Sequence, residues 1–75
     1  MPETILLDLS GLKCPLPALR TRKALKGLAR GSLLSVVCTD PMAVIDIPNL
    51  VRETGDTLAD QRTQGNTTTF DIRKS

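Results

Sequence analysis

The run LLSVVC, residues 33–38, constrains the fold more than any other stretch of this sequence. It is almost entirely apolar and contains β-branched residues, which is typical of a strand in the middle of a sheet. The chain has 75 residues. A domain of that size buries only about 60% of its unfolded surface, so its core is thin. We therefore expect residues 33–38 to form a central strand around which the other elements are arranged.

Five further elements are expected on either side of this strand. Their signals are hydrophobic periodicity, helix start and stop residues, and turn dipeptides. In chain order they are a strand at residues 5–9, a helix from Pro15 to about Leu28 ended by Arg30-Gly31, a helix from Asp40-Pro41 to about Thr54 stopped by Gly55, and two strands, Thr57 to Gln64 and Thr67 to Arg73, joined by Gly65-Asn66.

The order β-α-β-α-β-β predicts an α/β (α+β) fold in two layers. A strand, a helix and a following strand imply a right-handed parallel crossover, and the last two strands form an antiparallel hairpin. Residues 1–75 are then a single domain, with a mixed four-stranded sheet and two helices packed on one face. The third strand is mostly polar and suits an edge, so we expect the spatial order 1-2-4-3.

Helical periodicity also predicts which side chains face the core. In the second helix, Val44, Ile47 and Val51 are expected to be buried, Asp40 is expected to be the N-cap, and Pro48 should kink or break the helix. In the first strand, Ile5, Leu7 and Leu9 share one face. In the first helix the expected core face is Pro17, Ala18, Thr21, Ala24, Leu25 and Leu28.

Several classes of protein are excluded or disfavoured by composition. There is no histidine, so this chain contains no Ser-His or Cys-His catalytic pair, and two cysteines make neither a disulfide framework nor a structural metal site. The acidic N-terminal segment is unlike a signal peptide, and no apolar run approaches the roughly 20 residues that cross a membrane. We expect a cytoplasmic protein that does not associate with membranes.

Positive charge is concentrated in one segment. Between Lys13 and Arg30 there are six basic and no acidic residues, whereas the rest of the chain has four basic and eight acidic residues. A solvated helix face is one explanation. A docking surface for another protein is a second, and phosphate binding is a third.

The segment Cys14-Pro15-Leu16-Pro17 stands at the start of the basic helix. Proline fits the first helical turn because its missing N–H would have no intrahelical partner there. If Pro15 is the first helical residue, Cys14 is the N-cap. The helix dipole and the charges of Lys13 and Arg20 are then expected to lower the pKa of Cys14 from about 8.5 into a range of roughly 3.5 to 7.5. The prolines would hold an outward-facing, reactive sulfur in place.

The surroundings of Cys14 suggest where another protein would dock. Leu16 and Leu19 fall on the charged side of the helix, where they would leave an apolar spot rimmed by Lys13, Arg20 and Lys23, although Leu19 half buried under the following loop is an equal alternative. Cys38 ends an apolar strand and is expected to be a buried, inert thiol, with a resolving thiol or a second carrier thiol as the alternative. Asp8 is expected to tie down the turn after the first strand. Asp46 has no role that the sequence assigns.

The chain resembles the TusA/SirA/YedF family of small sulfur-carrier proteins. The shared pattern is Asp8-x-x-Gly11-x-x-Cys14-Pro15-x-Pro17, then Gly31, Thr39-Asp40 and Asp46-Ile47-Pro48. The resemblance implies that Cys14, positioned by Pro15 and Pro17, accepts a sulfane sulfur from a cysteine desulfurase or rhodanese and carries it as a persulfide to an acceptor protein. It implies a place in tRNA thiolation, molybdenum cofactor synthesis or sulfur oxidation. Many members have Gly-His where this chain has Gly55-Asp56, so a role for that histidine is excluded here.

Sulfur transfer of this kind needs an attacking thiolate and no metal or organic cofactor. The expected protein is therefore a persulfide carrier and not a free-standing enzyme that turns over a small substrate. An RNA-binding or regulatory module remains the alternative, since the predicted fold also resembles the C-terminal domain of a bacterial translation initiation factor. Phe70 is the only aromatic residue, so stacking on bases is nearly unavailable. A carrier requires Cys14, whereas a phosphate-binding surface does not.

Overall fold

The apolar run at the centre of the sequence forms strand β2 (Leu33–Cys38), which lies between two other strands. In this computed structural model, which describes residues 3–75, burial alternates along β2 and Leu34, Val36 and Cys38 face the core. The predicted domain spans residues 1–75, of which residues 1–2 lie outside the described residues. The prediction of a central strand is confirmed.

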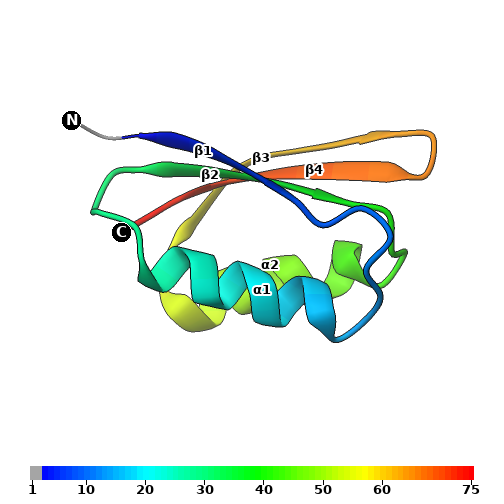
Figure 1. Cartoon of the computed structure of the whole chain (residues 1–75). Coiled ribbons are helices and arrows are strands. Elements are labelled where there is room, and N and C mark those ends of the chain that lie inside the picture. The colour runs from blue at the N-terminus through cyan, green and yellow to red at the C-terminus, as the bar shows by residue number, and fades with distance from the viewer. Residues whose placement is uncertain (1–2) are drawn as a thin grey trace.

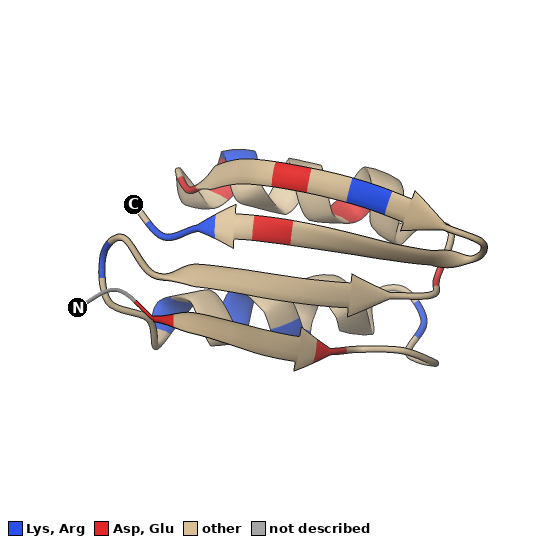
Figure 2. Ribbon diagram, turned by 90° about the horizontal axis from the view of Figure 1, so that it is seen from above, with Lys and Arg blue, Asp and Glu red and all other residues tan. Residues whose placement is uncertain are grey.

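The remaining elements follow in the predicted order. They are β1 (Thr4–Asp8), α1 (Leu16–Lys26), α2 (Ala43–Thr54), β3 (Thr57–Gln64) and β4 (Thr67–Arg73). The sheet order is β1-β2-β4-β3, with β1 parallel to β2 and the other pairs antiparallel. Both helices cover one face of the sheet (Figure 1) and leave the other face open (Figure 2). The predicted fold class and strand order are confirmed.

The core lies between the sheet and the two helices. Phe70 and Ile72 of β4 and Leu25 of α1 are fully buried there. On α1 the buried residues Pro17, Thr21 and Leu25 follow a spacing of four, as helical periodicity predicts. The other three residues of the predicted face are partly buried: Ala18, Ala24 and Leu28.

Two expectations about α2 differ from the structure. The prediction that Val44 is buried is wrong: Val44 is 44% exposed, because the helix begins at Ala43 and its buried face runs through Ala43, Ile47, Leu50 and Val51. Of the kink or break expected at Pro48, the break does not occur, since α2 continues from Ala43 to Thr54. The missing N–H of Pro48 leaves the carbonyl of Val44 without its helical partner. Since Val44 is exposed, water can satisfy that carbonyl.

Helix α1 ends earlier than expected. Its last residue is Lys26, and the N–H of Gly27 donates to the carbonyl of Ala24 at 3.2 Å. Leu28 N–H donates to the Leu25 carbonyl at 3.2 Å, so the chain tightens into a final turn before it leaves the helix. The predicted end at about Leu28 is therefore two residues too late.

The open face of the sheet is largely polar. Arg62 of β3 pairs with Asp60 and with Asp71 of β4, and Asp71 also accepts a hydrogen bond from Ser35 of β2. Figure 2 shows that charged positions of both signs lie on the neighbouring strands β3 and β4. None of the helices within residues 3–75 is long and apolar enough to span a membrane.

Thr21 generates a prediction about stability. Its side-chain oxygen is buried and has no hydrogen-bond partner within residues 3–75. Thr21→Val keeps the shape of the side chain and removes an unsatisfied hydroxyl, so it should raise the free energy of unfolding by about 1 kcal/mol. Urea unfolding measures this change. Thr54→Val is the matched control, since the single hydroxyl proton of Thr54 has an acceptor in either Asp56, 2.7 Å away, or the Val51 carbonyl, 3.2 Å away, and the change should lower the stability. A destabilised Thr21→Val would contradict the assignment.

Candidate functional site

The parallel pairing of β1 with β2 brings the chain segments after these two strands together. The Leu9 N–H donates to the Val37 carbonyl at 2.8 Å, which extends the pairing past the end of β1. The chain then turns at Gly11, whose φ of 85° is one that residues with a side chain rarely adopt. The Gly11 N–H donates to Thr39 Oγ1 at 2.9 Å. The loop that carries Cys14 is thereby fastened to the end of β2.

Cys14 lies one residue before the position predicted for it. The carbonyl of Pro15 accepts the first intrahelical bond, from the Leu19 N–H at 3.1 Å, which makes Pro15 the N-cap and Leu16 the first helical residue. The prediction that Cys14 caps the helix is therefore wrong. Pro17 sits in the first turn, as proline can, and is buried.

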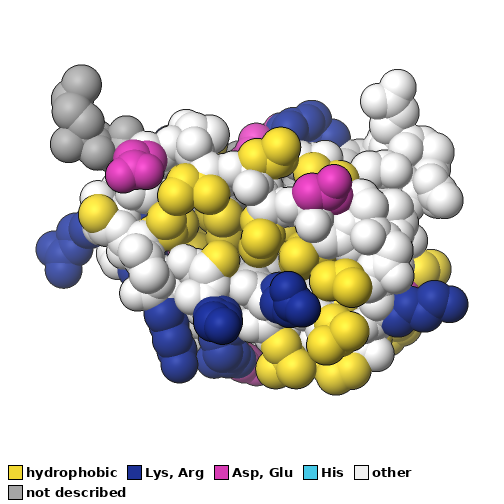
Figure 3. Space-filling view, in the orientation of Figure 1, with side chains coloured by type: hydrophobic (Ala, Val, Ile, Leu, Met, Phe, Trp, Pro, Cys, Tyr) yellow, Lys and Arg dark blue, Asp and Glu magenta, His cyan; other side chains and the backbone are white. Residues whose placement is uncertain are grey.

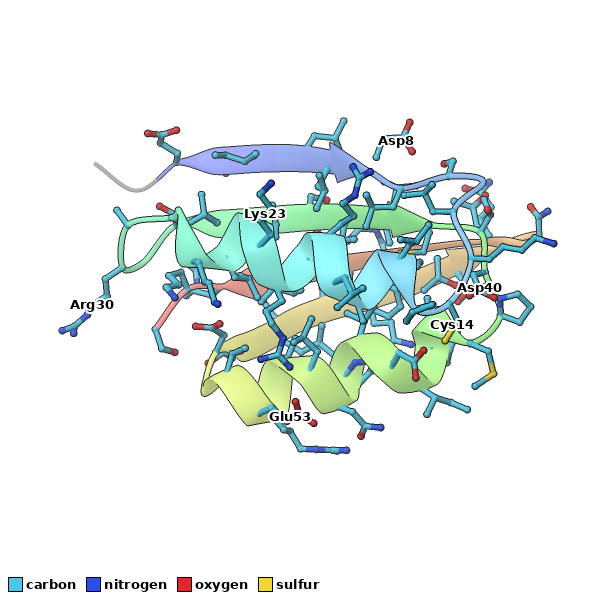
Figure 4. The ribbon with its side chains drawn as sticks, turned by 60° about the horizontal axis from the view of Figure 1, so that its bottom comes forward. Asp8, Cys14, Lys23, Arg30, Asp40 and Glu53 are labelled. Carbon is cyan, nitrogen blue, oxygen red and sulfur yellow. The ribbon has the colours of Figure 1, made fainter. Side chains whose placement is uncertain are left out.

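Asp40 is not the N-cap of α2 either. That position is held by Met42, and α2 begins two residues later than predicted. Asp40 Oδ1 accepts from the Met42 N–H at 3.2 Å, closing a local turn, while Asp40 Oδ2 accepts from the Cys14 N–H at 2.6 Å. Figure 4 shows the two residues together at the start of α1. One carboxylate thus fixes the entries to both helices.

Asp46 reaches the sulfur itself. Cys14 is exposed, and its Sγ donates to Asp46 Oδ2 at 3.2 Å across the gap between α1 and α2. Sequence reasoning missed this residue, because its contact depends on how the two helices pack. The only signal was the place of Asp46 in the Asp46-Ile47-Pro48 pattern of the family that the chain resembles.

The electrostatic prediction for Cys14 is also wrong. The hydrogen bond to Asp46 raises the pKa of the Cys14 thiol above its usual value, and desolvation by neighbouring atoms and the charges of Asp46 and Asp40 act in the same direction. A thiolate beside a carboxylate is disfavoured by like-charge repulsion. The carboxylates of Asp46 and Asp40 therefore shift the pKa of Cys14 in the direction opposite to the one expected from the helix start and the basic residues.

An open groove of about 340 Å³ runs beside Cys14 between the two helices. Leu19, which is 55% exposed, lies on the α1 side, so its alternative placement under a loop is wrong. The groove is lined by Cys14, Pro15, Ala18, Leu19, Arg22, Asp46, Asn49, Leu50 and Glu53. Arg22 Nη2 and Glu53 Oε2 form an ion pair of 2.8 Å across it. Within residues 3–75, no three His, Cys, Asp or Glu side chains are grouped to hold a metal ion.

The predicted docking residues do not lie on one surface. Arg20 and Lys23 line a different open groove, of about 690 Å³, between β1 and α1, together with Ile5 and Leu7. Figure 4 shows Lys23 pointing from α1 toward β1, and Figure 3 shows basic side chains along α1 with hydrophobic ones at its N-terminal end. Lys13 and Leu16 are exposed near Cys14. Only Leu19 of the predicted set shares the Cys14 groove.

Cys38 is separate from this site. It is 1% exposed in the core, and burial raises the pKa of its thiol to about 11, with a smaller contribution from Asp40. Its prediction as a buried thiol is confirmed. The prediction for Asp8 is also confirmed, since Asp8 Oδ1 accepts from the Ser10 N–H at 3.0 Å and from Ser10 Oγ at 2.6 Å.

Comparison with known proteins gives a consistent result. The sequence family described as "Sulfurtransferase TusA" matches residues 5–74. The sulfur carrier protein TusA of Allochromatium vinosum is 42% identical over 69 residues, covering 92% of this chain and 91% of the relative. The proteins of the same name from Pseudomonas paraeruginosa and Pseudomonas putida are 37% and 38% identical over 73 residues, covering 97% of this chain and 92% and 90% of the relatives.

The raised pKa of Cys38 predicts a loss of stability at alkaline pH. The folded protein keeps this proton up to about pH 11, whereas an exposed thiol loses it near 9.0. The free energy of unfolding should therefore fall as pH rises through this window, by up to about 3 kcal/mol. Urea unfolding between about pH 8 and pH 11 measures the fall. Cys38→Ala should lose most of it and Cys14→Ser should retain it, and an equal slope in all three proteins would refute the assignment.

Proposed function

The chain belongs to the TusA family of sulfur carriers, and we propose that it carries sulfane sulfur as a persulfide on Cys14. The observation that carries the proposal is the placement of Cys14. Its sulfur is exposed at the open groove between α1 and α2, while its backbone is fixed by Asp40. Another protein's reactive sulfur can reach such an atom without any opening of the fold.

The transfer is a thiol–persulfide exchange. The Cys14 thiolate attacks the outer sulfur of the donor's persulfide, a new S–S bond forms on Cys14, and the donor's S–S bond breaks so that its cysteine leaves as a thiolate. Transfer to the acceptor repeats the step with Cys14 as the leaving group. No net oxidation occurs, so the exchange requires no metal or redox cofactor.

The two prolines support this role by position. Pro15 is the N-cap of α1 and Pro17 is buried in its first turn, so the residues that follow Cys14 have restricted backbone freedom. A carrier benefits from a sulfur with a fixed location, because exchange requires alignment of three sulfur atoms. Asp56, which replaces the histidine of many relatives, accepts hydrogen bonds from Thr54 and from the Ser75 N–H and so has a structural use.

The proposed partners are those that membership of the TusA family implies. We propose a cysteine desulfurase or a rhodanese as the donor and a second sulfur-transfer protein as the acceptor, acting in the cytoplasm, where thiols stay reduced. The pathway would be tRNA thiolation, molybdenum cofactor synthesis or sulfur oxidation. In each case the protein acts as a relay, and direct binding of nucleic acid is not required.

Loading of sulfur tests the proposal. After incubation with a cysteine desulfurase and cysteine, mass spectrometry should find one added sulfur, roughly 32 Da, on the peptide that contains Cys14. Cys14→Ser should remain folded and carry none. Cys38→Ser should still load, although a buried hydroxyl without a partner lowers stability by about 1–3 kcal/mol. Sulfur found on Cys38, or loading that persists in Cys14→Ser, would show that the carrier is misassigned.

Docking is tested by reversing charge at Arg20 and Lys23. If their groove meets an acidic donor, the double change to Glu should slow association by about tenfold and weaken its dependence on salt, because exposed charges mainly steer encounter. Loading of Cys14 from a small persulfide should stay the same. Lys26→Glu with Arg30→Glu reverses equal charge farther along the chain and serves as the control. If the two double variants associate with the donor at equal rates, Arg20 and Lys23 belong to a solvated surface that does not guide docking.

A further inference from the structure

Cys14 is held by carboxylates, although it belongs to the basic part of the chain. Its Sγ donates to Asp46 Oδ2 at 3.2 Å, and its backbone N–H donates to Asp40 Oδ2 at 2.6 Å. Asp46 lies in the first turn of α2, where the helix dipole stabilises a negative charge. The groups in direct contact with Cys14 therefore include two anions that the chain itself keeps in place.

Among residues 3–75, no cation forms an ion pair with either of these two carboxylates. Arg22, the basic residue that lines the same groove, is paired with Glu53. The ion pairs within residues 3–75 involve Arg22 or Arg62, and none includes Asp40 or Asp46. Lys13 is the neighbour of Cys14 in sequence and is exposed, yet the net effect on the thiol is a raised pKa. The groove is thus locally negative.

A negative groove has a consequence for sulfur exchange. The nucleophile is the thiolate, and a carboxylate 3.2 Å from Sγ opposes its formation. A positive group brought next to the carboxylate would reverse that effect, since an opposite charge within about 4–6 Å favours the charged form. Because Arg22 is already paired, the positive group is best supplied by the molecule that exchanges sulfur with Cys14.

We propose that Asp46 holds Cys14 as a thiol in the free protein, and that the groove accepts an exchange partner that presents a Lys or Arg side chain to Asp46 beside its own reactive sulfur. The inference rests on the proposed function, in which Cys14 is the exchanging sulfur. Asp46 acts through Cys14 as a positioning residue. On docking, the partner's cation pairs with Asp46, the thiol proton passes to solvent, and the thiolate attacks the partner's sulfur.

Two small peptides test this charge preference directly. Each is a five-residue peptide with a central cysteine joined by a disulfide to thionitrobenzoate, and the cysteine is flanked by Arg in one peptide and by Glu in the other. Attack by Cys14 forms a disulfide with the peptide and releases the coloured thionitrobenzoate thiolate, which gives the rate. In the Cys38→Ser background at low salt, the Arg peptide should react at least about fivefold faster than the Glu peptide.

The variants separate the charge of Asp46 from its shape. Asp46→Asn should bring the reaction rates of the two peptides close together. It should also lower the pH at which the rate of Cys14 alkylation by the uncharged reagent iodoacetamide begins to rise. Asp46→Glu should keep most of the preference for the Arg peptide. Glu53→Gln removes equal charge from the same groove without touching Cys14, and it should keep the preference and the pH profile. Circular dichroism verifies that each variant is folded.

The outcomes are distinct. A Glu peptide that reacts as fast as the Arg peptide, or a preference that Asp46→Asn leaves unchanged, would overturn the inference. The inference would also be overturned if Glu53→Gln altered the peptide preference and the pH profile as much as Asp46→Asn does. Loading of Cys14 with sulfur from inorganic polysulfide is measured separately by mass. If Cys14 takes up sulfur but shows no preference for the Arg peptide, only the role proposed for Asp46 is wrong. If Cys14 prefers the Arg peptide but takes up no sulfur, the proposed carrier function is wrong.

Discussion

The site depends on the carboxylate of Asp40 more than on any other group. One of its oxygens accepts the Cys14 N–H and the other accepts the Met42 N–H, so a single side chain joins the entry of α1 to the entry of α2. The parallel pairing of β1 and β2 makes this possible, because it brings the carboxyl ends of both strands to the same edge. Without that junction the sulfur would have no fixed relation to Asp46.

The charge next to Cys14 is negative, although the segment of the chain that contains Cys14 is basic. The segment from Lys13 to Arg30 is strongly basic, but its long side chains reach solvent, the β1–α1 groove or, in the case of Arg22, a carboxylate of α2. The carboxylate bonded to the Cys14 sulfur belongs to α2, and the carboxylate bonded to the Cys14 N–H belongs to the connection before α2. Direct contact outweighs nearby exposed charge because solvent screens the latter. A basic surface that guides encounter and a negative groove that selects the reacting group are therefore compatible.

Hydrophobic periodicity was sufficient to predict the fold, since β2 is unmistakably central and polar β3 suits an edge. The place of Cys14 just before a helix was also predictable, because the two prolines that follow it suit a helix start. Local patterns failed where a side chain had two possible partners. Asp40-Pro41 is a typical helix start, yet Asp40 bonds to a residue 26 positions away. Asp46 could not be identified, because its contact spans 32 positions and depends on how the helices pack.

The most direct test of this account is the titration of Cys14 by NMR. The ¹³Cβ chemical shift of a cysteine changes when its thiol ionises, so cysteine labelling in the Cys38→Ser background reports the protonation of Cys14 alone in the folded protein. With an unstructured peptide of residues 10–20 as the reference, the account predicts a higher midpoint for Cys14 in the folded protein. It also predicts that Asp46→Asn lowers that midpoint toward the peptide's. A midpoint below that of the peptide would contradict the account, because the helix start and the basic residues would then govern the sulfur.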